Sequence, residues 1–422
     1  MTDPTVDTRV AAPWPSPYEL ATGLVTGVEP ADRTGPPAPV AASPLAALEA
    51  AVLPALRRPP CLVSFSGGLD SSMVLAVAAR VAARHGLPAP VPVTWRFTDA
   101  PAADESDWQD RVVDELRLRD RWQILPAADD LDLVGPVAQR FLRRYGVCHP
   151  LNTHLHLPIV ELAAGGSLLT GVGGDQILAG WRPPPPASPY RRLRLRASRL
   201  RARLRRAPSG IDLFPWLRPA AARDVLRRHR AERRAEPDRL DRRMAWHLRR
   251  RDLRLTVASF DRMGADHAVL VRHPFLDPGF VATLAATAGG RRGVSRRELL
   301  AELADGHLPP LLFQRQGKAH FLDVFLRAPT REFVRGWDGG GVDESVVDPA
   351  ALRAAWARWP IPECTAGLVQ HLWLRQHGST PRDYRHRDVP RPVIRPAARR
   401  RPRRRIPPTG RSPRGHPTRG AG

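Results

Sequence analysis

The sequence predicts an α/β protein that is built on a doubly wound parallel sheet and ends in a helical C-terminal part. Three observations lead to this prediction. Short apolar runs alternate with helical patterns of about 10 to 15 residues between residues 43 and 172. Two glycine-rich segments each follow one of these apolar runs directly. Beyond Trp181 the strand patterns stop, and the chain looks helical as far as residue 380. Strands joined by helices lie parallel, and a parallel sheet needs helices on both faces.

The first element is a helix, because Ser43 suits the N-cap and Pro44 the first helical position. Strands and helices then alternate. We expect strands at residues 61–65, 91–97, 121–125 and 167–172, and helices at residues 43–56, 71–85, 104–116, 132–146 and 155–165. These elements belong to one domain at residues 43–380, which follows an irregular, Pro/Ala-rich segment at residues 1–42.

Much of the positive charge lies in a tail. The net charge is +24, and residues 381–422 hold fourteen arginines against Asp383 and Asp388. The tail is rich in Pro and Gly and lacks apolar periodicity, so we expect it to be disordered. Such a polycation binds anions without specificity, and a solvated tail with no specific partner is the simpler interpretation. A second block, nine arginines at residues 190–206, could hold an acidic peptide or could be a solvated surface.

The chain is expected to be cytoplasmic. No run approaches 18 apolar residues, so we expect no membrane span. The N-terminus has no basic stretch followed by an apolar one, which argues against a signal peptide. Cys61, Cys148 and Cys364 are far apart and odd in number, which favours free thiols in a reducing compartment over a disulfide framework.

The strongest local pattern is the segment SFSGGLDSSMVLAVAAR, which joins a strand end to a helix start. Gly67 and Gly68 allow a tight turn whose N–H groups can approach an anion. Ser71 and Ser72 are expected to open the helix, whose N-terminus favours phosphate. Asp70 would repel a bare phosphate, so a cation between them, Mg²⁺ above all, is expected. The segment is not a Walker A loop, because it lacks G-K-[ST]. An ordinary turn with two glycines is the alternative.

This segment resembles the phosphate loop of the N-type ATP pyrophosphatases, and specifically that of the asparagine synthetase family. Three further segments are similar to motifs of that family and stand in the family's order. They are LLTGVGGDQILAGW at residues 168–181, VRHPFLD at residues 271–277 and RQGKAHF at residues 315–321. The resemblance covers roughly residues 44 to 376 and implies the Rossmann-like fold of the adenine nucleotide α hydrolases.

The resemblance also implies roles for individual residues. Asp70 and Asp175 would hold Mg²⁺ on the phosphates of ATP. The family pattern further implies that ATP is contacted by Val63 and Val93 at the adenine, by Ser66, Gly67, Gly68, Ser71 and Ser72 at the leaving pyrophosphate, and by Thr170 and Gly171 beside the ribose and α-phosphate. Gly173 and Gly174 are also expected to bind the nucleotide. In the implied reaction a substrate carboxylate attacks the α-phosphorus to give an acyl-adenylate and pyrophosphate. An amine then attacks the acyl carbon and releases AMP.

Lys318 is the only lysine among 66 basic residues. The family places a lysine here, against the phosphate and the acyl oxygen, and Arg315 belongs to the same motif. A compact ammonium can follow a charge that moves between atoms, whereas arginine presents a rigid planar fork. We therefore expect Lys318 and Arg315 to be catalytic. A surface lysine that is left by chance is the alternative.

Three positions depart from the family pattern. Gln176 stands where glutamate is usual, Val172 where amide-forming members carry glutamate or tyrosine, and Leu270 where a glutamate often precedes the arginine of R-x-P-F-L-D. Two apolar residues at positions that could supply a base remove the usual route for deprotonating an amine. The phosphate machinery therefore looks intact, and the acceptor machinery looks altered.

Residue 2 is Thr2, and some forty residues precede the first predicted helix, so no glutaminase domain is expected in cis. The chain resembles the synthetase domain of β-lactam synthetases and lasso-peptide cyclases, which implies amide formation in a natural product or modified peptide, with partner proteins of such a pathway. An ammonia-dependent asparagine synthetase-like enzyme, an RNA-modifying enzyme that docks RNA on its tail, and a non-catalytic ATP-binding relative stay open.

A zinc site in CHPLNTHLH, with Cys148, His149, His154 and His156, is disfavoured by its spacing.

Overall fold

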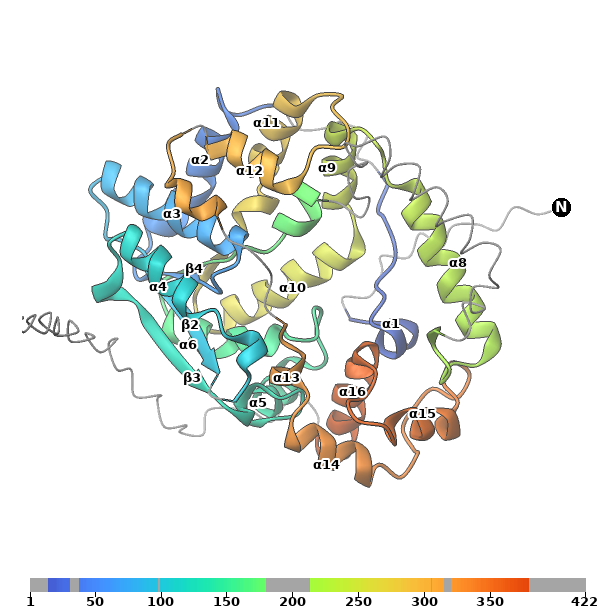
Figure 1. The fold of residues 1–422 in the computed structure, drawn as a ribbon. Helices are drawn as coiled ribbons and strands as arrows, with labels where there is room; N and C mark the ends of the chain where they lie inside the picture. The colour runs from blue at the N-terminus through green and yellow to red at the C-terminus, as the bar shows by residue number, and fades with distance from the viewer. Residues whose placement is uncertain are drawn as a thin grey trace, which may run out of the picture.

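The computed structural model describes residues 14–30, 38–97, 99–179, 213–304, 306–314 and 320–378. Its centre is a five-stranded sheet in which every pair of neighbouring strands is parallel (Figure 1). The strands are β1 (Cys61–Ser64), β2 (Val91–Phe97), β3 (Gln123–Ala127), β4 (Ser167–Leu169) and β5 (Leu270–Arg272). Within the described part of the chain, no helix is both long and apolar enough to cross a membrane.

The strand order is β3-β2-β1-β4-β5, so the chain builds outward from β1 in one direction and then in the other. Leu62 of β1 pairs with Val91 of β2 on one side and with Leu168 of β4 on the other. After β1 the chain continues to β2 on one side of the sheet, and after β4 it continues to β5 on the other side. The loops at the carboxyl ends of the neighbouring strands β1 and β4 therefore lead in opposite directions. In open α/β sheets a crevice forms at such a reversal of strand order, and ligands bind there.

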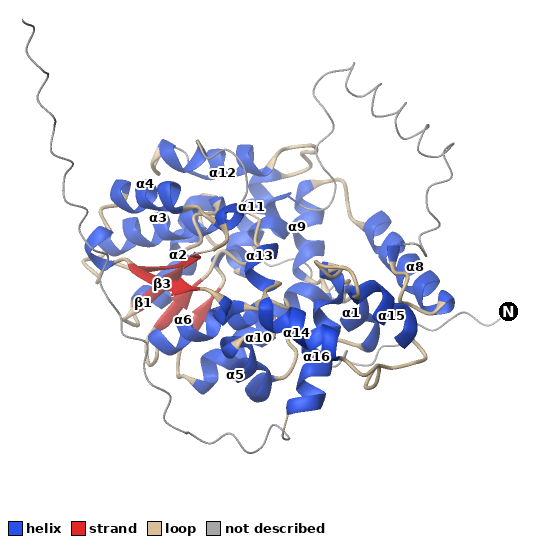
Figure 2. Ribbon diagram, turned by 60° about the horizontal axis from the view of Figure 1, so that its bottom comes forward, coloured by secondary structure: helices blue, strands red, loops and turns tan. Residues whose placement is uncertain are grey.

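Neighbouring residues of the central strands face opposite layers of helices. Val63 and Leu169 belong to a core with α2 and α3, whereas Leu62 and Leu168 belong to a core with α5, α6 and α10. Figure 2 shows these helices on the two sides of the red strands. Since a strand presents alternate side chains to its two faces, the continuous apolar runs of the sequence are what a sheet covered on both sides requires. The predicted doubly wound α/β fold is confirmed.

The helices are α1 (Pro17–Thr22), α2 (Pro44–Leu56), α3 (Leu69–Arg84), α4 (Ser106–Glu115), α5 (Pro136–Tyr145), α6 (Leu157–Leu162), α8 (Pro219–Ala235), α9 (Leu240–Leu248), α10 (Arg251–Asp266), α11 (Pro278–Ala288), α12 (Arg296–Ala304), α13 (Leu322–Phe325), α14 (Ala328–Gly336), α15 (Pro349–Trp356) and α16 (Ala366–His377). The last three share a separate apolar core with α1 and α8, in which Trp216, Trp356 and Trp373 are buried. The C-terminal part is helical, as predicted.

The short helix α1 lies inside the N-terminal segment that was expected to be irregular. Ser16 and Glu19 form a capping box, with the Ser16 amide donating to Glu19 Oε2 over 2.7 Å. A β-carbon on Gly367 of α16 would lie 2.8 Å from the carbonyl oxygen of Leu20, so α1 and α16 are in close contact. Tertiary packing therefore stabilises a helix that is too short to be recognised from its composition.

The expectation that strands stop beyond Trp181 is wrong, because β5 forms the edge of the sheet at Leu270–Arg272. Three residues between a helix and His273-Pro274 are too few to show a strand pattern. Strand β3 ends at Ala127, two residues later than predicted, and α3 begins at Leu69 rather than at Ser71. The arginine block at 190–206 and the tail at 381–422 lie outside the described residues.

Candidate functional site

The first glycine-rich segment forms the turn between β1 and α3. Gly67 has φ of +85°, a conformation that favours glycine. The Gly68 amide donates to Ser66 Oγ over 3.2 Å, and Ser71 Oγ donates back to the Gly68 carbonyl over 3.0 Å. Ser66 Oγ also lies 3.2 Å from Ser71 Oγ. Hydrogen bonds within the turn thus hold its two serine side chains together at the start of α3.

Helix α3 begins here without a side-chain cap. Gly68 is its N-cap and, having no side chain, provides no side-chain cap. The positive end of the helix dipole at this point favours an anion. Gly68, Leu69, Asp70 and Ser71 all border one cavity of about 540 Å³. The local geometry agrees with a phosphate-binding turn.

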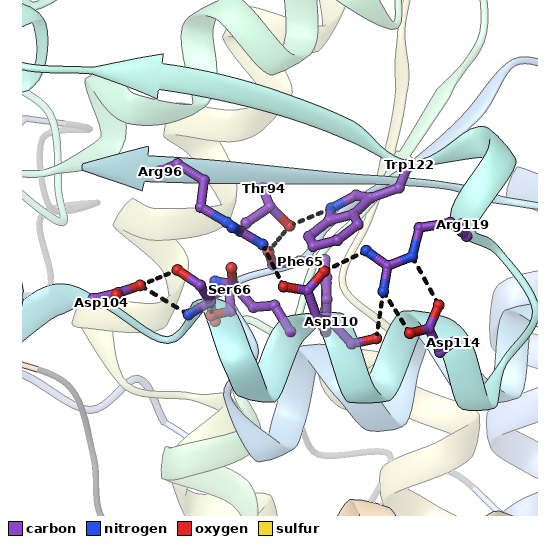
Figure 3. A network of polar contacts seen from close by, with 11 residues as sticks. Phe65, Ser66, Thr94, Arg96, Asp104, Asp110, Asp114, Arg119 and Trp122 are labelled. Carbon is purple, nitrogen blue, oxygen red and sulfur yellow. Dashed lines mark hydrogen bonds and ion pairs between the residues drawn. The ribbon is translucent and has the colours of Figure 1, made fainter. Parts of the chain in front are cut away.

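Contacts from β2 and α4 fix the carbonyl groups of this turn (Figure 3). Gln109 Nε2 donates to the Ser66 carbonyl over 3.0 Å, and Thr94 Oγ1 donates to the Phe65 carbonyl over 2.7 Å. Trp122 Nε1 in turn donates to Thr94 Oγ1 over 2.9 Å. Because these two carbonyl oxygens accept hydrogen bonds from α4 and β2, the peptide groups of the turn are held in one orientation. Sequence analysis identified neither Gln109 nor Thr94, since their role follows from the packing of β2 and α4.

The second glycine-rich segment follows β4 and rests against the first. A β-carbon on Gly171 would lie 2.9 Å from the Ser71 amide nitrogen, and one on Gly174 would overlap the carboxyl group of Asp70. Gly173 has φ of +92°, and a β-carbon there would overlap Leu276. A larger residue at 171 or 174 would press the second loop against the start of α3, and one at 173 would collide with Leu276. Thr170 and Gly171 border the cavity beside Asp70 and Ser71.

The two carboxylates that the sequence singled out meet at one cation. Arg296, the first residue of α12, bridges them: its Nη1 lies 2.7 Å from Asp175 Oδ1, and its Nε lies 3.1 Å from Asp70 Oδ1. Burial lowers the pKa of Arg296, but the charges of Asp70 and Asp175 outweigh it and raise that pKa overall. The Asp70 side chain is 14% exposed and that of Asp175 56%, so one carboxylate lies inside the cavity and the other at its mouth.

Sequence analysis missed Arg296. Its only local signal is S-R-R-E before an apolar run, which marks a helix start. The structure has this capping box, with the Ser295 amide donating to Glu298 Oε2 over 2.7 Å. The pattern gives the position of the helix but not what its first arginine faces. That depends on how α12 packs against the two loops.

The other predicted residues divide into those that border the cavity and those that support it. Ser66, Val93 and Thr170 border it. Val63 does not: its side chain is fully buried in the core with α2 and α3, so its place at the adenine stays a prediction. Its neighbours Ser64 and Phe65 border the cavity instead. Ser72 is also fully buried, and its Oγ donates to the Gly67 carbonyl over 3.4 Å, a supporting role.

Behind Thr170 lies a buried histidine. Thr170 Oγ1 is 2.7 Å from His273 Nδ1 and accepts a hydrogen bond from the Val172 amide over 3.2 Å. Burial lowers the pKa of His273 to about 4, so its ring is neutral at pH 7. No described residue forms a hydrogen bond with its Nε2. Val172 itself borders the cavity, so the apolar residue noted in the sequence does lie at the site.

In the CHPLNTHLH segment, as elsewhere in the described ranges, no three His, Cys, Asp or Glu side chains are grouped as metal ligands would be. Cys148 accepts a hydrogen bond from Arg262 over 3.3 Å, and His154 Nε2 lies 2.9 Å from the Leu131 carbonyl oxygen. His156 instead borders the cavity with Asn152. One histidine of the segment therefore reaches the candidate site, and it does so as a single side chain.

Lys318 and Arg315 lie outside the described residues. The described residues on either side of their segment reach the cavity: Leu312 before it and Phe321 after it both form part of the lining.

Comparison with known proteins identifies a family. A family model described as asparagine synthase matches residues 45–375. A search of curated proteins finds no match.

Proposed function

This chain belongs to the asparagine synthase family, and from that premise we propose that it is an ATP- and Mg²⁺-dependent ligase that activates a carboxylate as an acyl-adenylate and joins it to an amine. Family membership supports an ATP-dependent, amide-forming ligase in general. The adenylate intermediate, Mg²⁺ and a role in making a natural product or modified peptide belong to the proposal.

One observation carries it: Asp70 and Asp175, from two separate loops, approach a single cation beside the uncapped start of α3. In this structure the cation is the guanidinium of Arg296. Mg²⁺ in nucleotide sites is commonly held by one or two carboxylates together with phosphate oxygens and water. The donor set therefore fits Mg²⁺, with Asp70 and Asp175 as its protein ligands. When bound, the ion would neutralise phosphate charge and polarise the bonds around the reacting phosphorus.

In the first step, a carboxylate oxygen of the substrate forms a bond to the α-phosphorus of ATP. The bond from that phosphorus to the oxygen bridging to the β-phosphate breaks, and its electron pair leaves with pyrophosphate. The start of α3 and the hydroxyls of Ser66 and Ser71 would bind the leaving group, because the positive end of the helix dipole favours negative charge and both serines border the cavity beside it. The Ser71 hydroxyl would turn from the Gly68 carbonyl toward the phosphate. The fixed carbonyls of Phe65 and Ser66 hold the turn in place.

In the second step, the amine nitrogen attacks the acyl carbon, and the bond from that carbon to the adenylate oxygen breaks. AMP leaves with the electron pair, and the nitrogen gives up a proton. Lys318 would stabilise the negative charge that develops on the acyl oxygen. Val172 lies at the cavity wall and has no basic group. We therefore propose that the amine either arrives neutral or gives its proton to another group.

The proposal is tested by binding first, because binding requires no knowledge of the carboxylate. A non-hydrolysable ATP analogue with Mg²⁺, at about 100 times its Kd, should raise the free energy of unfolding by roughly 2.7 kcal/mol. Asp70→Asn and Asp175→Asn should each remove most of that gain, whereas Asp107→Asn, at an exposed position of α4, should keep it. No stabilisation of the natural chain would refute a nucleotide site. AMP release in the presence of carboxylates then separates a ligase from a relative that only binds ATP.

A further inference from the structure

The cavity has two unlike ends. At one end lie the two glycine-rich turns, the carboxylates and Arg296. At the other end the wall is formed by six large apolar side chains, namely Trp95, Phe97, Leu131, Leu155, Phe321 and Phe325. The first end suits the phosphates of a nucleotide. The second end, which we call the apolar wall, has no role in the chemistry proposed above.

The apolar wall is pre-formed. Its side chains pack on one buried cluster that contains Leu131 and Val324, although they come from β2, from the segments before α5 and α6, and from α13 with the residue before it. The rings of Phe97 and Phe321 meet edge to face at 6.0 Å. Trp95 Nε1 donates to the Leu155 carbonyl over 3.1 Å, so the polar atom of this indole is already hydrogen-bonded. A wall that is held in this way needs little rearrangement to bind a ligand.

Charge is absent from the apolar wall. The charged side chains among the described residues that line the cavity are Asp70, Asp175, Arg296 and Arg297, and all four belong to the glycine-rich loops or to the start of α12. The one other titratable ring in that lining, His156, is neutral at pH 7, because burial lowers its pKa to about 3. The described lining near the wall offers no charged partner for a second charge on a substrate.

We propose that the apolar wall binds a bulky apolar group on the substrate that carries the reacting carboxylate. The substrate is then a carboxylic acid with an apolar chain or ring rather than a small charged amino acid such as aspartate. This inference rests on the proposed function. A second carboxylate placed against Phe321 and Phe325 would lose its water without gaining a charged partner among the described residues of the lining. An apolar chain or ring would be stabilised there by removal of its surface from water.

The inference is tested by titration calorimetry on the full chain, saturated with Mg²⁺ and a non-hydrolysable ATP analogue. 4-Phenylbutyrate and aspartate are the two probes. The natural chain should bind 4-phenylbutyrate at least about tenfold more tightly than aspartate. Phe325→Ala should lower the affinity for 4-phenylbutyrate about tenfold and change the affinity for the ATP analogue by less than about twofold. Phe325→Leu should retain most of the affinity, and Phe333→Ala, at a part-buried position of α14 outside the cavity lining, should change neither.

Three results would overturn the inference. Aspartate could bind as tightly as 4-phenylbutyrate, or neither could bind. Alternatively, Phe325→Ala could weaken the analogue as much as the carboxylate, which would mean that the wall receives the adenine. If Phe325→Ala does not fold, Phe321→Ala at a part-buried position gives the same comparison. Failure of the analogue to bind the natural chain is a separate result, because it refutes the proposed function itself.

Discussion

Gly174 leaves space for the carboxyl group of Asp70: a β-carbon on the glycine would lie 2.3 Å from the aspartate's Cγ, far inside van der Waals contact. The second glycine-rich segment and the start of α3 are therefore complementary in shape at this point. A side chain at residue 174 would have to displace the Asp70 carboxyl group. This contact connects two of the four segments that carry the family resemblance.

Gly174→Ala is expected to separate the loops. The added methyl group should lower the free energy of unfolding by about 1 to 3 kcal/mol, the usual cost of overpacking, and abolish stabilisation by the ATP analogue. Thermal unfolding with and without the analogue measures both effects. Gly336→Ala is the control, since a β-carbon there would meet no described atom within 4 Å. Full stabilisation of Gly174→Ala by the analogue would contradict this account of the contact.

Arg296→Gln is expected to favour a metal ion at the site. In the natural chain the guanidinium competes with any cation for Asp70 and Asp175. Its removal leaves two carboxylates facing each other, so Mg²⁺ alone should bind roughly 5- to 10-fold more tightly, and the melting temperature should depend more steeply on its concentration. Arg291→Gln, which removes an exposed ion pair with Glu302, is the matched control. Equal Mg²⁺ dependence in the variant and the natural chain would rule out the competition.

Lys318→Arg is expected to slow the chemistry while sparing nucleotide binding. The guanidinium keeps the charge but not the compact, rotatable set of donors, so AMP formation should fall about 100-fold or more. The affinity for the ATP analogue should change less than about threefold. Arg335→Lys on α14 makes the reverse exchange at an exposed position and should leave both quantities unchanged. Unchanged AMP formation in Lys318→Arg would remove Lys318 from the mechanism.

The buried ring of His273 should make the free energy of unfolding depend on pH. Its pKa in the folded chain is lowered to about 4 by burial, from an ordinary value of 6.5. Between these values the unfolded chain binds the extra proton, so stability should rise with pH from about 4 to 6.5 and then level off. His273→Gln should flatten this rise by about 2 to 3 kcal/mol. Chemical denaturation across that pH range measures the slope, and identical slopes in the two proteins would contradict the assignment.

Removing residues 381–422 should leave catalysis unaffected. The tail holds fourteen of the arginines, and its expected effect is non-specific attraction to polyanions. The truncated chain should form AMP within about twofold of the full chain, but it should bind nucleic acid more weakly and with a shallower salt dependence. Loss of AMP formation would favour the alternative of an enzyme that docks RNA on its tail.

The sequence predicted the parts of the site that depend on local pattern. Gly67, Asp70 and Asp175 stand in short motifs whose turn and helix start follow from neighbouring residues. Arg296 could not be predicted as part of the site, because its position depends on the packing of α12 against loops that are distant in the sequence. The apolar wall could not be predicted for the same reason, because its residues come from several separate segments.

Strand geometry limits what the sequence predicts. The side chain of Val63, a residue expected at the adenine, faces the core with α2 and α3, since alternate residues of β1 point to opposite faces. Strand β5 was missed because three residues carry no recognisable periodicity. A single sequence shows such periodicity only for longer strands.

The contact between α1 and α16 brings the beginning and the end of the folded domain together. Leu20 and Gly367 touch, so the first and last helices of the described chain lie side by side. A circular permutant that joins Trp14 to Gly378 through a short flexible linker should therefore keep the fold, provided that the new ends are opened in an exposed loop. In such a protein the order of the catalytic segments along the chain could be changed while their arrangement in space is preserved.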